Sequence, residues 1–229
     1  MRRYLQALPP AAEFAIVILG AFGLFFLATF LALVTKTGAG DGAGTGWYTG
    51  EHLISVISYE LPIGAVLFAF LRERGWSLER LGVRVTATET LVGFGLAFFA
   101  EFACYAVLIA VAIVFPKFIQ AIAASQVKPG SFGLALVILA SIVNPIFEET
   151  FVCGYVVTVL KERSSISTAI TISIAIRLLY HLYQGAVAFF GIIPFGFVVA
   201  WWYARTGRLW PVIVAHGIGD FIAFVGYIN

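Results

Sequence analysis

Six ionisable side chains in the apolar second half of the chain have spacings suited to acid–base chemistry. They are Glu148, Glu149, Arg177, His181, His216 and Asp220. Arg177 and His181 are four residues apart in RLLYH, and His216 and Asp220 are four apart in HGIGD, so each pair shares one face of a helix. The adjacent glutamates of FEET point about 100° apart and can face different neighbours.

Ionisable side chains cost free energy in surroundings as apolar as those of these six residues. The chain is 229 residues long, 61% hydrophobic and 11% charged, with a mean hydropathy of +0.99. Soluble domains carry about 25% charged residues, so the composition predicts an integral, multi-pass membrane protein. A charge at bilayer depth costs at least about 2.5–3.5 kcal/mol, so the cluster indicates function or a partnered interior.

Three mechanisms suit these residue types. In the first, a glutamate and an imidazole activate water while a second imidazole and Asp220 face the developing oxyanion. In the second, His181, His216 and a glutamate hold zinc, with the fourth position open to water. The third is a nucleophile, for which Cys153 is the one candidate at helical spacing from a base, and we discount it.

A second class of function competes with catalysis. Buried Glu, His and Arg also build the proton relays of membrane transporters. The sequence shows no duplicated halves of the kind that carriers often have, which argues against a proton-coupled carrier. Replacing Glu148 by Gln separates the classes, because it should abolish cleavage in an enzyme and alter gradient dependence in a carrier.

The elements that position the cluster are apolar helices. We predict an all-α, polytopic transmembrane bundle of seven to eight helices, with the catalytic cavity within the membrane. The expected spans are 12–35, 53–71, 89–115, 132–160, 167–183, 186–204 and 209–227. Glycines and Pro194 in 184–208 leave a re-entrant or broken helix open there. Within 72–88, the spacing of Trp76, Leu78 and Leu81 predicts an interfacial helix.

We expect one membrane domain, 1–229, with N-terminal helices over 12–115 and the motif-bearing helices over 130–227. With the N-terminus inside, the inside segments hold Arg2, Arg3, Arg72, Arg74, Arg80, Arg84, Lys161, Arg163, Arg205 and Arg208. The outside loops hold Lys36, Lys117 and Lys128. This bias predicts a cytoplasmic N-terminus, in a cell (inner) membrane.

With the motifs in view, the chain resembles the CPBP family of intramembrane proteases, which includes the CAAX prenyl proteases and the bacteriocin-processing or self-immunity (Abi) proteins. The family pattern is EExxxR, then FxxxH, then HxxxN or HxxxD. The matching stretches here are EETFVCG from Glu148, RLLYH ending at His181 and HGIGD from His216. The flanks YHLYQG and TGRLWPVIVAH also resemble bacterial members, and the likeness covers about 130–225.

The resemblance implies a glutamate-dependent endopeptidase without a catalytic metal, with zinc as the alternative cofactor. It implies that Glu148 is the base, His181 its water-orienting partner, and His216 with Asp220 the oxyanion side. Glu149 and Arg177 are then supporting residues. Cys153 stands where the family usually has Arg, and we expect Arg177 to supply the missing cation to Glu149.

The resemblance also implies the partners. A membrane-associated peptide or protein is the expected substrate, the bilayer is the surrounding solvent, and no nucleic acid is expected. A catalytically inactive immunity or chaperone protein on the same fold is a further alternative, made plausible by Cys153. Whether a substrate is prenylated is left open by the residues.

Overall fold

The computed structural model describes residues 6–35, 49–117, 133–182 and 186–226, and they contain helices and turns with no strand. Most of the Gly-rich segment 38–50 and of the segment 116–131, both of which lie between predicted spans, falls outside these ranges. The helices are α2 (Pro10–Thr35), α3 (Gly50–Glu73), α4 (Ala87–Val114), α6 (Leu134–Glu149), the π-helix η1 (Thr150–Val157), α7 (Thr158–Lys161), α8 (Ile166–His181), α9 (Ala186–Thr206) and α10 (Trp210–Val225). The all-α class is confirmed.

Four described helical segments are long and apolar enough to cross a membrane: Pro10–Leu31, Gly50–Glu73, Ala87–Val114 and Leu134–Lys161. Ile166–His181 and Trp210–Val225 are shorter apolar helices. Within its described range α9 runs unbroken from Ala186 to Thr206 through Pro194, so the broken helix left open by the sequence for 184–208 does not occur in that range. Large apolar side chains of α4 such as Phe98 and Ile113 stay exposed, as lipid-facing residues do.

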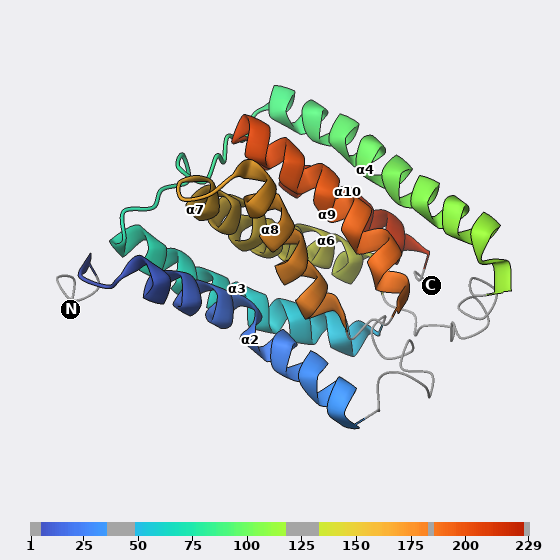
Figure 1. The fold of residues 1–229 in the computed structure, drawn as a ribbon, viewed down its shortest axis with the longest axis horizontal. Helices are drawn as coiled ribbons and strands as arrows, with labels where there is room; N and C mark the ends of the chain where they lie inside the picture. The colour runs from blue at the N-terminus through green and yellow to red at the C-terminus, as the bar shows by residue number, and fades with distance from the viewer. Residues whose placement is uncertain (1–5, 36–48, 118–132, 183–185, 227–229) are drawn as a thin grey trace.

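The rod formed by α6, η1 and α7 is the centre of the bundle (Figure 1). Its α6 part packs against α3 and α10, and its η1 part packs against α8 and α9. Helix α4 covers α9 and α10 on one side, while α2 covers α3 and α8 on the other. The rod therefore contacts helices from both halves of the chain.

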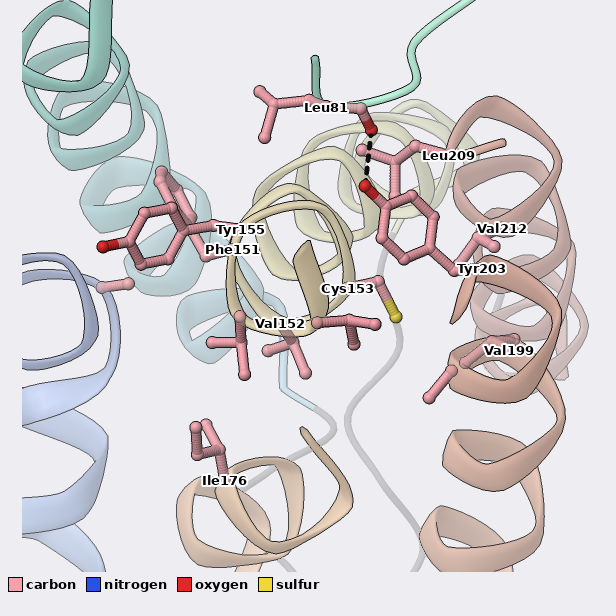
Figure 2. Packing of buried hydrophobic residues seen from close by; sticks show 14 of the residues in the cluster. Leu81, Phe151, Val152, Cys153, Tyr155, Ile176, Val199, Tyr203, Leu209 and Val212 are labelled. Atoms are coloured by element: carbon pink, nitrogen blue, oxygen red, sulfur yellow. Dashed lines mark hydrogen bonds between the residues drawn. The ribbon is translucent and has the colours of Figure 1, made fainter. Parts of the chain in front are cut away.

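The π-helix lies inside the hydrophobic core, and all residues from Phe151 to Val157 are buried (Figure 2). Its i→i+5 bonding leaves a carbonyl to be satisfied from outside, and such segments frequently occur at functional sites. The Tyr203 hydroxyl of α9 lies 3.2 Å from the Gly154 carbonyl and 3.1 Å from the Leu81 carbonyl. Tyr203 thus joins the π-helix to the loop before α4.

The loop 74–86 corrects one prediction. It forms turns where an interfacial helix was expected. Of the three residues behind that prediction, Trp76 and Leu81 are buried in the core and Leu78 is exposed. Trp76 Nε1 donates a hydrogen bond to Glu13 Oε1, at 3.1 Å. The apolar residues of this loop therefore pack against the helix bundle. The same spacing of apolar residues would suit contact with a lipid surface, so the sequence pattern alone does not separate the two cases.

Pro145 and Gly217 bring α6 and α10 into close contact. Pro145 has no N–H, so it leaves the carbonyl of Ser141 without its usual helical donor. A Cβ at Gly217 would lie 2.6 Å from that carbonyl oxygen. Only glycine fits this approach, and the neighbouring His216 is carried toward the end of α6 by it.

We expect Gly217→Ala to lower stability by about 1–3 kcal/mol, because the added methyl meets backbone that cannot move aside. It should also lower activity, since His216 moves with α10. Thermal unfolding in detergent measures the first effect. Gly95→Ala is the matched control, because that helical glycine of α4 has open space around its Cβ position. Equal unfolding temperatures for both variants would contradict the tight contact.

Candidate active site

Glu149 is the fully buried anchor of the site. It ends α6, and its side chain has no exposed surface. Arg177 Nη2 of α8 donates to its Oε2 at 2.8 Å, and His216 Nδ1 of α10 lies 2.6 Å from its Oε1. A carboxylate only accepts, so both neighbours act as donors. Glu149 therefore ties three helices together, and the pairing with Arg177 expected from the sequence is confirmed.

The Arg177 guanidinium lies close to two further side chains besides Glu149. Its Nη1 lies 3.5 Å from Glu148 Oε2, and its Nη2 is 4.0 Å from Cys153 Sγ. The guanidinium therefore occupies the space next to the residue where the family pattern has Arg. Helix α9 leaves room for it, because a Cβ at Gly196 would lie 3.3 Å from Arg177 Cδ.

Glu148, which is almost entirely buried, is held by several groups. Tyr180 donates to Oε2 at 2.6 Å, and Asn144 Nδ2 donates to Oε1 at 3.1 Å. His181 Nε2 lies 3.7 Å from Oε2, beyond hydrogen-bond length. A carboxylate offers about four lone-pair sites, so Glu148 keeps capacity for a further donor beside His181.

His216 lies between two carboxylates. Its Nε2 is 3.5 Å from Asp220 Oδ1, on the side of the ring away from Glu149. The Phe195 ring of α9 packs against the imidazole, with centroids 5.1 Å apart. Asp220 Oδ2 is buried and has no hydrogen-bond partner among the described residues. Of the two carboxylates beside His216, Asp220 is thus held less tightly than Glu149.

The short length of α8 explains how residues predicted at different depths meet. A helix of 16 residues is about 24 Å long, less than the bilayer core of about 30 Å. Its last residue, His181, therefore lies at the depth of Glu148, which is midway along the central rod. Leu209, the N-cap of α10, is fully buried, so α10 begins within the bundle and brings His216 to a similar depth.

The six residues named from the sequence are all in this cluster by the contacts above. Reasoning from the sequence missed Asn144 and Tyr180, although both contact Glu148. Asn144 precedes Glu148 by four residues, a spacing that places it on the same helix face. Tyr180 is adjacent to His181 and stacks on Phe22 of α2, with centroids 4.4 Å apart. A cavity beside Glu148 stays a prediction.

One set of three donors among the described residues has a spacing suited to a metal ion: Glu148, Glu149 and His216, with ligand atoms within 4.8 Å of one another. The set fits zinc poorly. Both oxygens of Glu149 already accept from Arg177 and His216. The guanidinium would also repel a divalent cation placed there. His181 is outside the set, so the expected trio of two histidines and a glutamate is not assembled.

Arg177→Ala should lower stability by about 3–5 kcal/mol, because Glu149 is left charged and buried without its cation. It should also lower activity. Cys153→Arg added to it should restore part of each, since the guanidinium then returns from the neighbouring side chain. Unfolding in detergent and peptide cleavage measure the two effects. Wild-type stability and activity in Arg177→Ala would mean that Glu149 does not depend on this pair.

The comparisons with known proteins agree with these motifs. Residues 130–222 match the sequence profile described as Type II CAAX prenyl endopeptidase Rce1-like. Neither the curated proteins nor the solved structures contain a match to the chain. The region 130–222, which holds all six of the residues predicted for the site, is therefore similar to the Rce1-like CAAX prenyl endopeptidase family.

Proposed function

We propose that this protein is an intramembrane endopeptidase that hydrolyses a peptide bond of a membrane-associated protein or peptide with water activated by Glu148 and His181. The family match carries the coarser statement, a protease of the CAAX type. The observation that supports the mechanism is the 3.7 Å between Glu148 Oε2 and His181 Nε2. Two groups at this separation can hold one water between them, each at hydrogen-bond distance.

Glu148 takes the proton of that water, and the resulting hydroxide attacks the scissile carbonyl carbon. The carbonyl oxygen becomes an oxyanion, for which His216 Nε2, only loosely engaged by Asp220 at 3.5 Å, is the available donor. The C–N bond then breaks, and Glu148 returns the proton to the leaving nitrogen. Water supplies both the oxygen and the proton, so no other reactant is needed.

The supporting residues separate the roles of the two glutamates. Arg177 and His216 engage both oxygens of Glu149, which leaves it no capacity to activate water. Glu148 has one close donor on each oxygen, Asn144 on Oε1 and Tyr180 on Oε2, with Arg177 Nη1 farther away at 3.5 Å from Oε2, and it keeps room for water. The proposal therefore assigns the base to Glu148 and charge compensation to Glu149 with Arg177.

The basic ends of the helices lie together, which supports one orientation. Arg74 pairs with Glu13, Arg80 with Glu162 at 3.0 Å, and Arg208 with Glu89 at 2.8 Å. These pairs join the N-terminal end of α2 to the loop after α3, that loop to the end of α7, and the loop after α9 to the first turn of α4. We place this end at the cytoplasmic face of the cell membrane, following the positive-inside rule.

Glu148→Gln should lower kcat by about 10² or more, because acid–base groups typically contribute 10²–10⁴. His181→Ala and His216→Ala should have effects of similar size, and Asp220→Asn a smaller one. Cleavage of a quenched fluorescent peptide with a farnesylated CAAX end measures this in detergent. Comparison of membrane-protein termini in cells with wild type and with Glu148→Gln identifies substrates of other kinds. Unchanged cleavage in Glu148→Gln would contradict the mechanism.

Chelation should leave activity unchanged, because the donors of the site are engaged with Arg177 and with one another. Native mass spectrometry of the purified protein should show no stoichiometric zinc. Incubation with EDTA, compared with EDTA already saturated with zinc, separates metal removal from other effects of the chelator. One bound zinc per chain, together with inhibition by free EDTA only, would favour the zinc mechanism instead.

A further inference from the structure

We propose that Glu60 of α3 is a positioning residue, which holds Glu148 in its reactive orientation through Asn144. This role rests on the proposed function of Glu148. It also extends the site beyond the region that matches the family, because Glu60 precedes residue 130. No motif of the sequence includes Glu60, which is followed two residues later by Pro62.

The contact is direct, and the carboxyl groups at its two ends are buried. Asn144 Nδ2 donates to Glu60 Oε1 at 2.8 Å and to Glu148 Oε1 at 3.1 Å. Glu60 is only 2% exposed. An amide NH₂ group has two hydrogens, so each carboxyl group receives one of them. Asn144 therefore links Glu60 of α3 to the predicted base of α6.

The second contact of Asn144 determines its orientation. The last torsion of an asparagine side chain is broad, with no strong staggered preference. A single hydrogen bond to Glu148 would leave the amide plane poorly fixed and remove the acceptor of the second N–H. With Glu60 in place, both hydrogens are satisfied and Asn144 meets Glu148 Oε1 at a fixed angle. The other oxygen, Oε2, is thereby directed toward Tyr180 and His181.

Helix α3 is itself held in the rotation that this contact needs. The Tyr59 hydroxyl donates to the Gly20 carbonyl of α2 at 2.7 Å, and Glu60 follows about 100° farther around the helix. One turn later, a Cβ at Gly64 would lie 3.1 Å from the Phe147 ring. Tyr59 thus faces α2, while Glu60 and Gly64 face α6.

Asn144 requires an acceptor oxygen from Glu60 and not a charge. Glu60 Oε2 is buried and has no hydrogen-bond partner among the described residues. An isolated charge at this depth is costly, whereas a neutral carbonyl oxygen accepts the same hydrogen bond. Glutamine at position 60 should therefore support catalysis, and an apolar residue of similar size should not.

The test compares Glu60→Gln, Glu60→Leu and Glu60→Met in the full-length protein, with the farnesylated CAAX peptide as probe. Loss of the acceptor should lower kcat by about 10- to 100-fold with KM nearly unchanged, because a small misplacement of a catalytic group has effects of this size. Glu60→Gln should stay close to wild type. Met repeats the removal of the acceptor with an unbranched side chain that adapts to the space.

Two further measurements separate positioning from general stability. Glu60→Leu combined with Asn144→Leu should have the kcat of Asn144→Leu alone, because both act along one path. Ser141→Ala is the control, since this buried hydroxyl on the same helix has no partner among the described residues. It should leave kcat unchanged.

Each remaining outcome overturns the proposal. A fully active Glu60→Leu or Glu60→Met would show that Asn144 needs no second acceptor. A Glu60→Gln variant as slow as Glu60→Leu would show that the carboxyl group acts through charge or proton transfer. Additive effects in the double variant would place Glu60 on a separate path. An inactive Glu148→Gln beside a fully active Glu60→Leu rejects only this inference, whereas an active Glu148→Gln rejects the proposed function as well.

Discussion

The buried ion pair between Arg177 and Glu149 is the interaction on which the arrangement of the other groups depends. Two adjacent carboxyl groups inside an apolar bundle require a cation. Arg177 supplies it from α8, and the same guanidinium lies within 3.5 Å of Glu148. His216 completes the partners of Glu149 from α10. The same contacts therefore compensate the charge of the glutamates and hold the three helices together.

The backbone on both sides of the two glutamates allows the neighbouring helices to approach them. Pro145 frees a carbonyl of α6, and Gly217 lets α10 approach it. On the other side of the glutamates the π-helix begins at Thr150. Its Gly154 carbonyl accepts a hydrogen bond from the Tyr203 hydroxyl. The helix is thus irregular on both sides of FEE and rigidly packed around it. Irregular backbone at this depth is tolerated because it is buried in protein and not exposed to lipid.

Hydropathy predicted the fold well because each span must satisfy its own backbone bonds and cover about 20 apolar residues. Buried charges likewise identified Glu148, His181 and His216 as candidates, since lipid excludes such groups without a partner. The contacts of Tyr180 and Glu60 were not predictable, because they depend on how helices far apart in the chain are rotated, whereas the contact of Asn144 with Glu148 follows from their four-residue spacing in one helix. The turns around Trp76 were mispredicted as a helix, since burial against Glu13 produces the same apolar spacing as contact with lipid.

The stacking of Phe22 on Tyr180 bears on how such proteins can diversify. Phe22 belongs to α2, outside the region that matches the family, yet it packs on the residue whose hydroxyl contacts Glu148. The N-terminal helices are therefore not an interchangeable module attached to a self-sufficient catalytic half. An exchange of these helices between related chains would have to preserve an aromatic surface at this position. Sequence drift in the first half of the chain is constrained by the second half at that point.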